Sequence, residues 1–183
     1  PHGKVAVNQA VTVDPGHALT VAAGTEVKAP GKITAEKVNL EADDAKVELT
    51  AANEIQTVTG KAGSLALKNA VDIALGKAGT PSEGLTLKSG ASEVESAGDI
   101  TVAGDGVAST GTGSLAFTTS TAKHVRLEQN TKIKGTGTNQ FDLKVRTGTL
   151  DLASGVKIDA TGGKADFAIN KINLPGTETD LIQ

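Results

Sequence analysis

Short stretches in which apolar and polar residues alternate follow one another along almost the whole 183-residue chain. Each has the form apolar–x–apolar, which is typical of a β-strand with one buried face, because successive side chains of a strand point to opposite sides. Gly, Asn, Asp, Ser, Thr and Pro, which favour turns, separate the stretches. The predicted strands contain residues 5–7, 11–13, 19–21, 38–40, 47–49, 65–67, 71–73, 85–87, 100–102, 115–117, 125–127, 143–145, 150–152, 156–158, 167–169 and 172–174.

The segment from Lys61 to Lys77 is the best candidate for a helix, because it is rich in Ala and Leu. Gly63 and Gly76 lie near its ends, however, and Val71-Asp72-Ile73 alternates with the period of a strand. We therefore predict strand here, with a helix as the alternative, and an all-β protein overall.

Strand length and composition favour one architecture within the all-β class. The chain has three Phe and no Tyr, Trp, Met or Cys, so its core must be built from Val, Leu, Ile and Ala. The predicted strands are about three to five residues long and recur roughly every 6–10 residues, as in a β-solenoid. We predict a single domain over residues 1–183, a right-handed parallel β-solenoid (β-helix) of about eight coils with roughly 18–24 residues each. A β-sandwich is the alternative.

Two segments have the composition of solenoid coils. Residues 85–102 and 143–158 each contain three alternating stretches and are predicted to form one coil apiece. Ser96-Ala97-Gly98-Asp99-Ile100-Thr101-Val102-Ala103-Gly104 and the run from Leu150 to Gly163 resemble coils of filamentous-haemagglutinin-type and autotransporter passenger domains. The resemblance extends by pattern over about half of the chain. It implies a right-handed β-helix at a bacterial surface, used in adhesion or in building fibres.

Charge and composition exclude several classes of function. The formal net charge is −3 and both signs are interspersed, whereas a nucleic-acid interface needs clustered Lys and Arg, usually with aromatic residues. No apolar run approaches the roughly 20 residues needed to span a bilayer as a helix. The chain begins Pro1-His2-Gly3 and lacks Met and Cys, which favours an exported protein, extracellular or at the cell surface, whose signal peptide has been removed.

Calcium is the one cofactor for which the sequence offers candidate ligands. Hard cations prefer several oxygen ligands, and Asp99 lies near Asp105 of the motif Gly104-Asp105-Gly106. Asp43-Asp44 is a second acidic pair. The tandem glycine- and aspartate-rich nonapeptides of calcium-binding β-rolls are missing, and Asp and Gly are also ordinary turn residues. Asp99 and Asp105 are therefore the predicted calcium ligands, with structural turns as the alternative.

The histidine and threonine residues suggest no catalytic site. His2 lies near the start of the sequence, His17 follows a predicted turn, and His124 precedes a strand and is expected to face solvent. Thr-x-Thr units resemble those of ice-binding solenoids, but their spacing is too uneven to place one unit in each coil. These units are Thr110/Thr112, Thr119/Thr121, Thr136/Thr138 and Thr147/Thr149.

A polysaccharide-active β-helix enzyme is a remote alternative. Such a site needs clustered Asp residues with Arg or Lys on adjacent coils, and sugar subsites usually include aromatic residues. The chain has only two arginines, Arg126 and Arg146, and neither Tyr nor Trp. Asp151 and Asp159 are expected to be outward-facing, solubilising charges. We therefore expect no enzymatic activity.

The sequence favours a non-enzymatic structural protein, a self-assembling subunit of a filament, sheath or surface layer. Exposed sheet edges invite pairing with another chain, and residues near 1–13 and 169–183 carry apolar alternation that can join a neighbouring copy. The expected partners are thus further copies of the chain. An adhesin passenger module that binds a glycan or another surface ligand is the alternative.

Overall fold

The computed structural model describes residues 3–77, 80, 83–88, 90–103, 106–109, 113–135, 141–160 and 162–175, and within them the chain forms β-strands and no helix. The strands are β1 (Lys4–Ala6), β2 (Val11–Thr12), β3 (Ala18–Ala22), β4 (Glu26–Ala29), β5 (Ile33–Asn69), β6 (Ile73–Leu75), β7 (Leu85–Leu87), β8 (Gly90–Ser96), β9 (Ile100–Val102), β10 (Val107–Ser109), β11 (Gly113–Thr118), β12 (His124–Leu127), β13 (Lys132–Gly135), β14 (Phe141–Leu152), β15 (Lys157–Asp159) and β16 (Ala165–Asn173).

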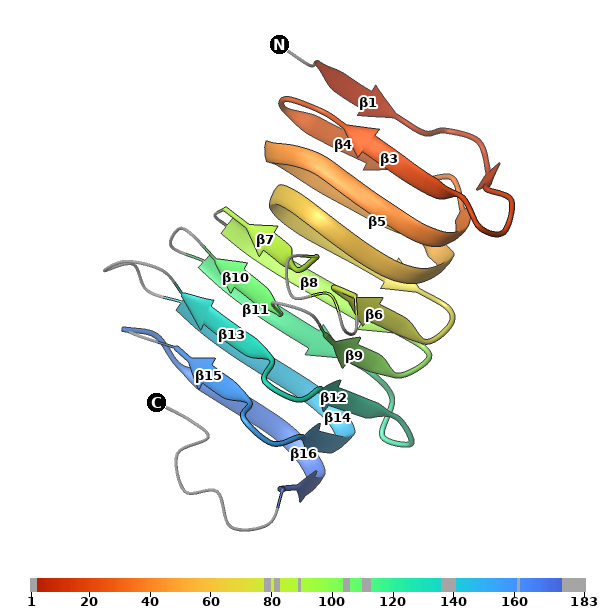
Figure 1. The fold of residues 1–183 in the computed structure, drawn as a ribbon. Helices are drawn as coiled ribbons and strands as arrows, with labels where there is room; N and C mark the ends of the chain where they lie inside the picture. Colours follow the sequence, from red (N-terminus) through yellow and green to blue (C-terminus); the bar gives the residue numbers. More distant parts are fainter. Residues whose placement is uncertain are drawn as a thin grey trace.

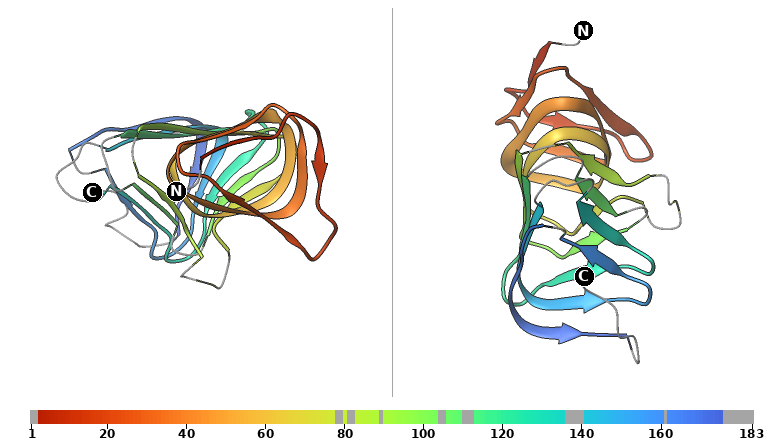
Figure 2. Two further views of the ribbon diagram at one scale, coloured as in Figure 1. Left: turned by 90° about the horizontal axis from the view of Figure 1, so that it is seen from above. Right: turned by 90° about the vertical axis from the view of Figure 1, so that its left-hand side faces the viewer.

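The strands wind into a stack of about seven coils, which confirms the parallel β-solenoid and excludes the β-sandwich. Each strand pairing in the described segments is parallel, and all sixteen strands belong to one sheet that coils around itself. Figure 1 shows β1 at one end of the stack and β16 at the other, and Figure 2 views the stack along and across its axis.

Three columns of paired strands form the second half of the stack. The first contains β8, β11 and the first part of β14, the second contains β6, β9, β12 and the last part of β14, and the third contains β7, β10, β13 and β15. Residues 85–102 contribute β7, β8 and β9, one strand to each column, and residues 143–158 likewise pass through all three columns. Each segment forms one coil, as predicted.

Two strands are much longer than the expected three to five residues. β5 has 37 residues and β14 has 12, because the backbone bends around the corners without losing its pairing to the neighbouring coils. Buried Asn53 holds one such corner. Its Oδ1 accepts a hydrogen bond from the N–H of Ile33 at 2.8 Å, and its Nδ2 donates to the carbonyl of Leu49 at 3.0 Å. A side-chain amide thus bridges two coils where a turn was expected.

The sequence pattern missed three strands and placed one incorrectly. β4, β10 and β13 each contain a single large apolar residue, respectively Val27, Val107 and Ile133, so they lack the alternation used to find strands. The predicted strand at 71–73 is wrong in its first part, because β6 begins at Ile73 and Val71 is 36% exposed. The segment 61–77 is strand where it is regular, in β5 and β6, and the helix alternative is wrong.

The period of the stack varies more than the roughly 18–24 residues expected. Paired residues on neighbouring coils lie as little as 17 positions apart, for Thr57 and Ala74, and as much as 28 apart, for Ala116 and Lys144. The three-strand cross-section is kept while the connections between strands change in length. This difference explains why the sequence shows no strict repeat.

The core is a narrow column of aliphatic side chains. Val27, Val47 and Leu115 are completely buried, and Phe117 is the largest fully buried side chain among the described residues. No buried side-chain nitrogen or oxygen in the described segments lacks a hydrogen-bond partner. Each coil therefore contributes a few apolar residues, and parallel stacking joins them into one continuous core.

Leu152→Asp tests this inward register. Leu152 is 4% exposed, so the variant buries an unpaired carboxylate and is expected to lower the free energy of unfolding by about 4 kcal/mol or more. Lys157→Asp, at an exposed position of β15, is the control and is expected to change stability little. Thermal unfolding followed by circular dichroism measures both variants, and a wild-type midpoint for Leu152→Asp would contradict the register.

Candidate functional site

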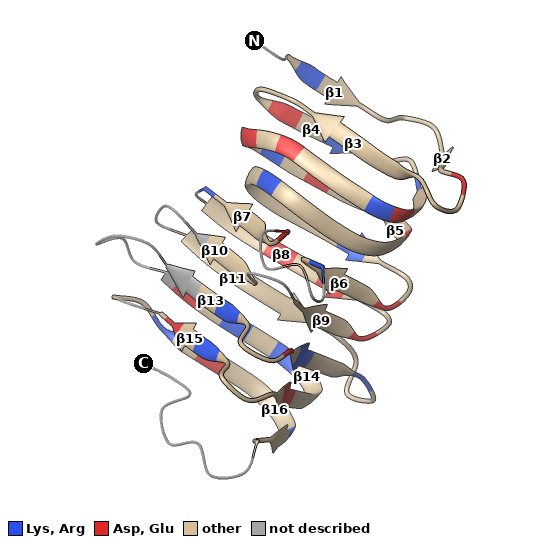
Figure 3. Ribbon diagram, viewed as in Figure 1, with Lys and Arg blue, Asp and Glu red and all other residues tan. Residues whose placement is uncertain are grey.

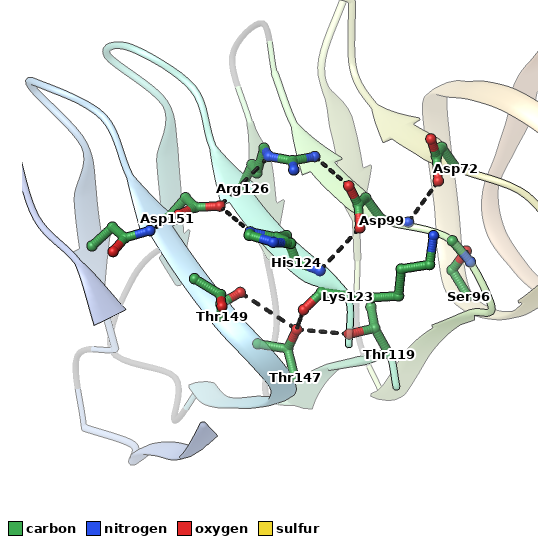
Figure 4. Close-up of polar contacts among 12 residues, drawn as sticks. Asp72, Ser96, Asp99, Thr119, Lys123, His124, Arg126, Thr147, Thr149 and Asp151 are labelled. Carbon is green, nitrogen blue, oxygen red and sulfur yellow. Dashed lines mark hydrogen bonds and ion pairs between the residues drawn. The ribbon is translucent and has the colours of Figure 1, made fainter. Parts of the chain in front are cut away.

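Charged and polar side chains from successive coils form a line on the outer surface of the solenoid (Figure 4). They lie at the second column of strands, in or just before β6, β9, β12, the end of β14 and the end of β16. We call this line the polar ladder, and it consists of Asp72, Asp99, His124, Arg126, Asp151 and Asn173.

Parallel pairing aligns the ladder. Ile100, Val125 and Leu150 pair in register and point into the core, so the residues on either side of them face outward. The outward residue after Val125 is Arg126, which pairs in register with Asp151 of β14. Neighbouring strands lie about 4.8 Å apart, so these side chains are within reach of one another. The alternation that buries the core thus also creates the ladder.

Asp99 connects three coils. Its own N–H donates to Oδ1 of Asp72 at 2.8 Å. Its Oδ1 accepts from the N–H of His124 at 3.0 Å, and its Oδ2 accepts from Nη1 of Arg126 at 2.5 Å. The side chain is only 17% exposed, so these contacts replace most of its hydration.

Asp151 is the second acidic centre of the ladder. Its Oδ2 lies 2.6 Å from Nδ1 of His124 and 3.5 Å from Nε of Arg126, and its Oδ1 accepts a hydrogen bond from Nδ2 of Asn173. The Nδ1 of His124 faces a carboxylate and therefore carries a proton in this arrangement. Arg126 thus lies between two carboxylates, each of which has further donors.

Both carboxyl groups have pKa values below the ordinary range of Asp. Burial by itself raises the pKa of Asp99, but the backbone N–H of His124 and the guanidinium of Arg126 outweigh burial and lower it. Burial likewise raises the pKa of Asp151, and the hydrogen bonds from His124 and Asn173 outweigh it. The two groups are therefore stable carboxylates at neutral pH.

A shorter threonine chain runs beside the ladder. The hydroxyls of Thr119 and Thr147 lie 2.7 Å apart, and Oγ1 of Thr147 also donates to the carbonyl of Lys123 at 3.0 Å. Thr147 is only 4% exposed, so this pair braces a corner and does not belong to a flat exposed threonine surface. Thr110, Thr112, Thr136 and Thr138 lie outside the described residues.

Of the two predicted calcium ligands, only Asp99 lies within the described residues. The contacts of Asp99 are those described above, and Asp105 lies outside the described residues. In the described part of the chain, no group of three or more His, Cys, Asp or Glu side chains is arranged to hold a metal ion. Calcium binding at Asp99 and Asp105 thus stays a prediction.

The structure places the histidines considered in the sequence analysis in different environments. His17 is exposed in a turn, where its N–H donates to the carbonyl of Asp14 at 3.2 Å, as its sequence context indicated. His2 lies outside the described segments. His124 was expected to face solvent, and its side chain is 35% exposed and bonded to Asp151. The sequence analysis therefore missed the polar ladder, although Arg126 and Asp151 are separated by the same 25 residues as Val125 and Leu150.

A groove crosses the coils elsewhere on the surface. Two adjoining hollows of about 370 and 510 Å³ share Asn39, Gly60 and Lys61 in their linings. Gly60 has φ +99°, and a Cβ at this position would lie 2.2 Å from the carbonyl oxygen of Leu40, so the groove floor requires glycine. Lys37 and Glu83 form an ion pair at 2.9 Å in the lining of the smaller hollow. The lining of the groove contains charged side chains of both signs together with apolar residues such as Leu40 and Leu85.

No protein-family model, curated protein or solved structure matches this chain. Among the described residues there is no helix long and apolar enough to cross a membrane.

Arg126→Met tests the ladder as a stabilising element. The variant leaves Asp99 and Asp151 without their shared cation, and we expect the free energy of unfolding at pH 7 to fall by about 1–3 kcal/mol. In the wild type, the lowered pKa values add stability above the unfolded pKa of about 3.9, and this stability is lost as pH falls through the folded values. The difference between variant and wild type is therefore expected to shrink below about pH 4.

Urea unfolding at pH 7 and pH 3 measures this difference. The control is Arg146→Met, because the Arg146 guanidinium lies 3.8 Å from the Asp166 carboxylate and both side chains are more than half exposed. That exposed pair is expected to contribute little at either pH. An equal loss for Arg126→Met at both pH values would mean that Arg126 stabilises the fold by packing alone.

Proposed function

We propose that the protein is a non-enzymatic structural subunit that acts outside the cell and joins further copies of itself end to end, in a filament, sheath or layer. The observation that carries this proposal is the distribution of incompletely covered apolar side chains. Most of them lie on the first and last coils of the stack, and Val71 and Ala153 are the exceptions among the described residues.

The apolar residues of the end coils support this reading directly. On the first coil Val5 and Val7 are only partly buried, although they point toward the core. On the last coil Ile172 is 42% exposed, and Leu174, just after β16, is 55% exposed. The only other exposed large apolar side chain among the described residues is Val71, which is 36% exposed and lies between the ends. Covering the end coils would remove this surface from water.

The backbone of β1 and β16, the strands at the two ends of the stack, also supports association with further copies. In the described segments β1 pairs with β4 alone and β16 with β14 alone. The second edge of each strand therefore presents N–H and C=O groups to which a further strand can bond. Addition of a strand at such an edge is a common mode of association between proteins.

The polar ladder supports a structural role over catalysis. A glycoside hydrolase of the usual kind needs one carboxyl group that stays protonated, with a raised pKa, to act as the general acid. Asp99 and Asp151 both have lowered pKa values, and their oxygens accept hydrogen bonds from neighbouring coils. In this proposal the ladder ties coils together.

An adhesin passenger module is the second candidate, and the groove at Asn39, Gly60 and Lys61, with charges of both signs in its lining, is the observation that favours it. Both candidates place the protein at a cell surface, which rests on the composition and on the resemblance to passenger-domain coils. They differ in the expected state in solution, because a subunit associates with itself and a module stays monomeric.

Sedimentation velocity over a range of protein concentrations, with negative-stain electron microscopy, tests this proposal. We expect the wild type to form linear assemblies, and the double variant Ile172→Lys with Leu174→Lys to remain monomeric, because it places two charges on the apolar end. Val71→Lys introduces a charge at an exposed apolar position away from the ends and is expected to assemble like the wild type. A wild type that stays monomeric at all concentrations would refute the subunit and favour the module.

A further inference from the structure

We infer that the groove at Asn39, Gly60 and Lys61 binds an extended, uncharged glycan chain that lies along the axis of the stack. The inference goes beyond the proposed function, because the groove is complete within one molecule and needs no second copy. It adds a binding activity to the structural role and involves no catalytic step.

The groove follows the stack axis across five successive coils. Its lining residues belong to the segments 23–24, 39–44, 59–61, 83–86 and 106–108, one segment from each coil. Val21 pairs with Leu40, and Gly60 of the next coil lies against the Leu40 carbonyl. Leu85 pairs in register with both Gly60 and Val107. Neighbouring coils are about 4.8 Å apart, so the groove is about 19 Å long and suits a linear ligand.

Glycines keep the floor of the groove low. Gly24, Gly60, Gly84 and Gly106 lie in the lining, on four of the five coils. Gly60 and Gly106 have φ values of +99° and +74°, and a Cβ added to Gly106 would lie 2.0 Å from the carbonyl oxygen of Lys132. The backbone of the coils therefore requires these two glycines, and the hollow is present without a ligand. A preformed site avoids the cost of ordering side chains or loops on binding.

Two ion pairs border the groove. The Nζ of Lys37 lies 2.9 Å from the Glu83 carboxylate, and the Nζ of Lys88 contacts the Asp44 carboxylate. Each pair joins the second coil to the fourth and so spans the coil that contains Gly60. Along the strand direction, one pair lies before the groove floor and the other after it. These four charges compensate one another within the protein.

The remaining charges of the lining are few and of both signs. Lys61 lines both hollows and has no ion pair among the described residues, and Glu41 and Asp43 line the larger hollow. Figure 3 shows basic and acidic residues interspersed over the coils. A polyanion would meet the two carboxylates, and a polycation would meet the Lys61 ammonium group. The lining therefore favours an uncharged ligand.

The polar groups of the lining match hydroxyl groups. Asn39 lines both hollows, its Oδ1 accepts a hydrogen bond from the Thr59 hydroxyl at 3.2 Å, and its Nδ2 has a long contact of 3.4 Å to Glu41. A side-chain amide nitrogen carries two hydrogens, an ammonium group carries three, and a carboxylate accepts several hydrogen bonds. The lining thus offers donors and acceptors side by side. A sugar hydroxyl both donates and accepts, so it can pair with either kind.

The same lining also offers small apolar surfaces. Ala108 is partly exposed and the glycines present their Cα groups, whereas Leu40 and Leu85 are only 1% exposed. An amphipathic helix, which needs a continuous apolar groove, would find none here. A sugar ring has hydroxyl groups at its rim and C–H groups on its faces, so it can use both parts of the lining.

An extended peptide fits this groove less well than a glycan. Such peptides commonly bind by adding a strand at a free sheet edge. The strands under the groove already have neighbours, since β7 pairs with β5 on one side and with β10 on the other. The groove also runs across the strands, so a ligand lying in it is perpendicular to them and cannot join the sheet.

Binding by this groove is expected to be weak. Its lining contains no aromatic side chain on which a sugar ring could stack, so affinity depends on hydrogen bonds. We expect a dissociation constant in the millimolar range for one groove. An assembly would present the groove once in each copy, and several grooves acting on one glycan chain would increase the overall affinity.

Saturation-transfer difference NMR, which detects weak binding, tests the inferred ligand class. The probes are cellohexaose and mannohexaose, which are linear and uncharged, and hexagalacturonate and hexalysine, which carry negative and positive charges. We expect at least one uncharged hexasaccharide to bind more tightly than both charged probes. Failure of both uncharged probes to bind at millimolar concentration, or tighter binding of a charged probe, would overturn the inference.

Ala108→Leu tests the location of the site. Ala108 faces outward from β10 in the groove lining, and a leucine there would fill one end of the groove. We expect binding of the uncharged probe to weaken about tenfold. The control is Ala116→Leu, at a partly exposed, outward-facing position of β11 outside the groove, which is expected to bind like the wild type. Equal weakening in both variants would contradict a site in the groove.

Lys61→Met tests the polar contacts. This variant keeps most of the side-chain length and removes the ammonium group, and we expect the uncharged probe to bind about fivefold more weakly. Lys157→Met makes the same change in net charge at an exposed position of β15 and is expected to have no effect. An equal loss in the two variants would mean that net charge, and not a contact in the groove, controls binding.

Repeating the titration with the double variant Ile172→Lys with Leu174→Lys separates this inference from the proposed function. We expect this variant to bind the probe like the wild type, because the groove lies within one copy. Binding by the wild type alone would place the site between copies and overturn the inference, while the subunit proposal stands. A wild type that is monomeric and binds the probe in the groove would refute the subunit proposal and support the inference.

Discussion

Parallel, in-register pairing between coils is the constraint on which the other features of this structure depend. In such a stack each residue meets, above and below, the residues at the same position of the neighbouring coils. A column of strands therefore gives all its members one environment, as the buried residues Ile73, Ile100 and Val125 illustrate. An inward column is mostly apolar, and its polar members, such as Asn53, are hydrogen-bonded. In an outward column, opposite charges on adjacent strands stabilise the pairing, although Lys132 and Lys157 also pair in register.

The polar ladder follows from this constraint. Arg126 lies between Asp99 and Asp151 because adjacent coils bring those positions together, and a third carboxylate at position 126 would have made the column repulsive. Backbone hydrogen bonds alone do not fix which residues of two adjacent coils pair, since two parallel strands can shift along each other and form the same bonds in another register. A charge pattern with one favourable alignment opposes such slippage, in the same way as the apolar alternation does on the inner face.

The fold class could be predicted from the sequence because the alternation of apolar and polar residues within a strand does not depend on the length of the coil. The predicted strand 125–127 is β12 without its first residue, and 100–102 is β9. The residue pairs between coils could not be predicted, because the distance between paired positions varies from 17 to 28 residues. Without the pairing, His124 and Asp151 are separate surface residues 27 positions apart. β4, β10 and β13 escaped detection for another reason. Pairing with the neighbouring strands of the sheet holds them in place more than their own residue pattern does.

The two end strands differ from the inner ones only in the number of their neighbours. Glu26 has a lysine on each side, Lys4 and Lys46, whereas in the described chain Lys4 has a register partner on one side alone. Val27 is completely buried between two coils, while Val5, in the same column, is only partly covered. The pairing that stabilises each inner coil is therefore present on one side only of β1 and β16 within the described chain. In the proposed end-to-end assembly, a second copy would supply the missing strand at each edge without any new kind of interaction, since it would repeat the parallel pairing by which the coils already stack.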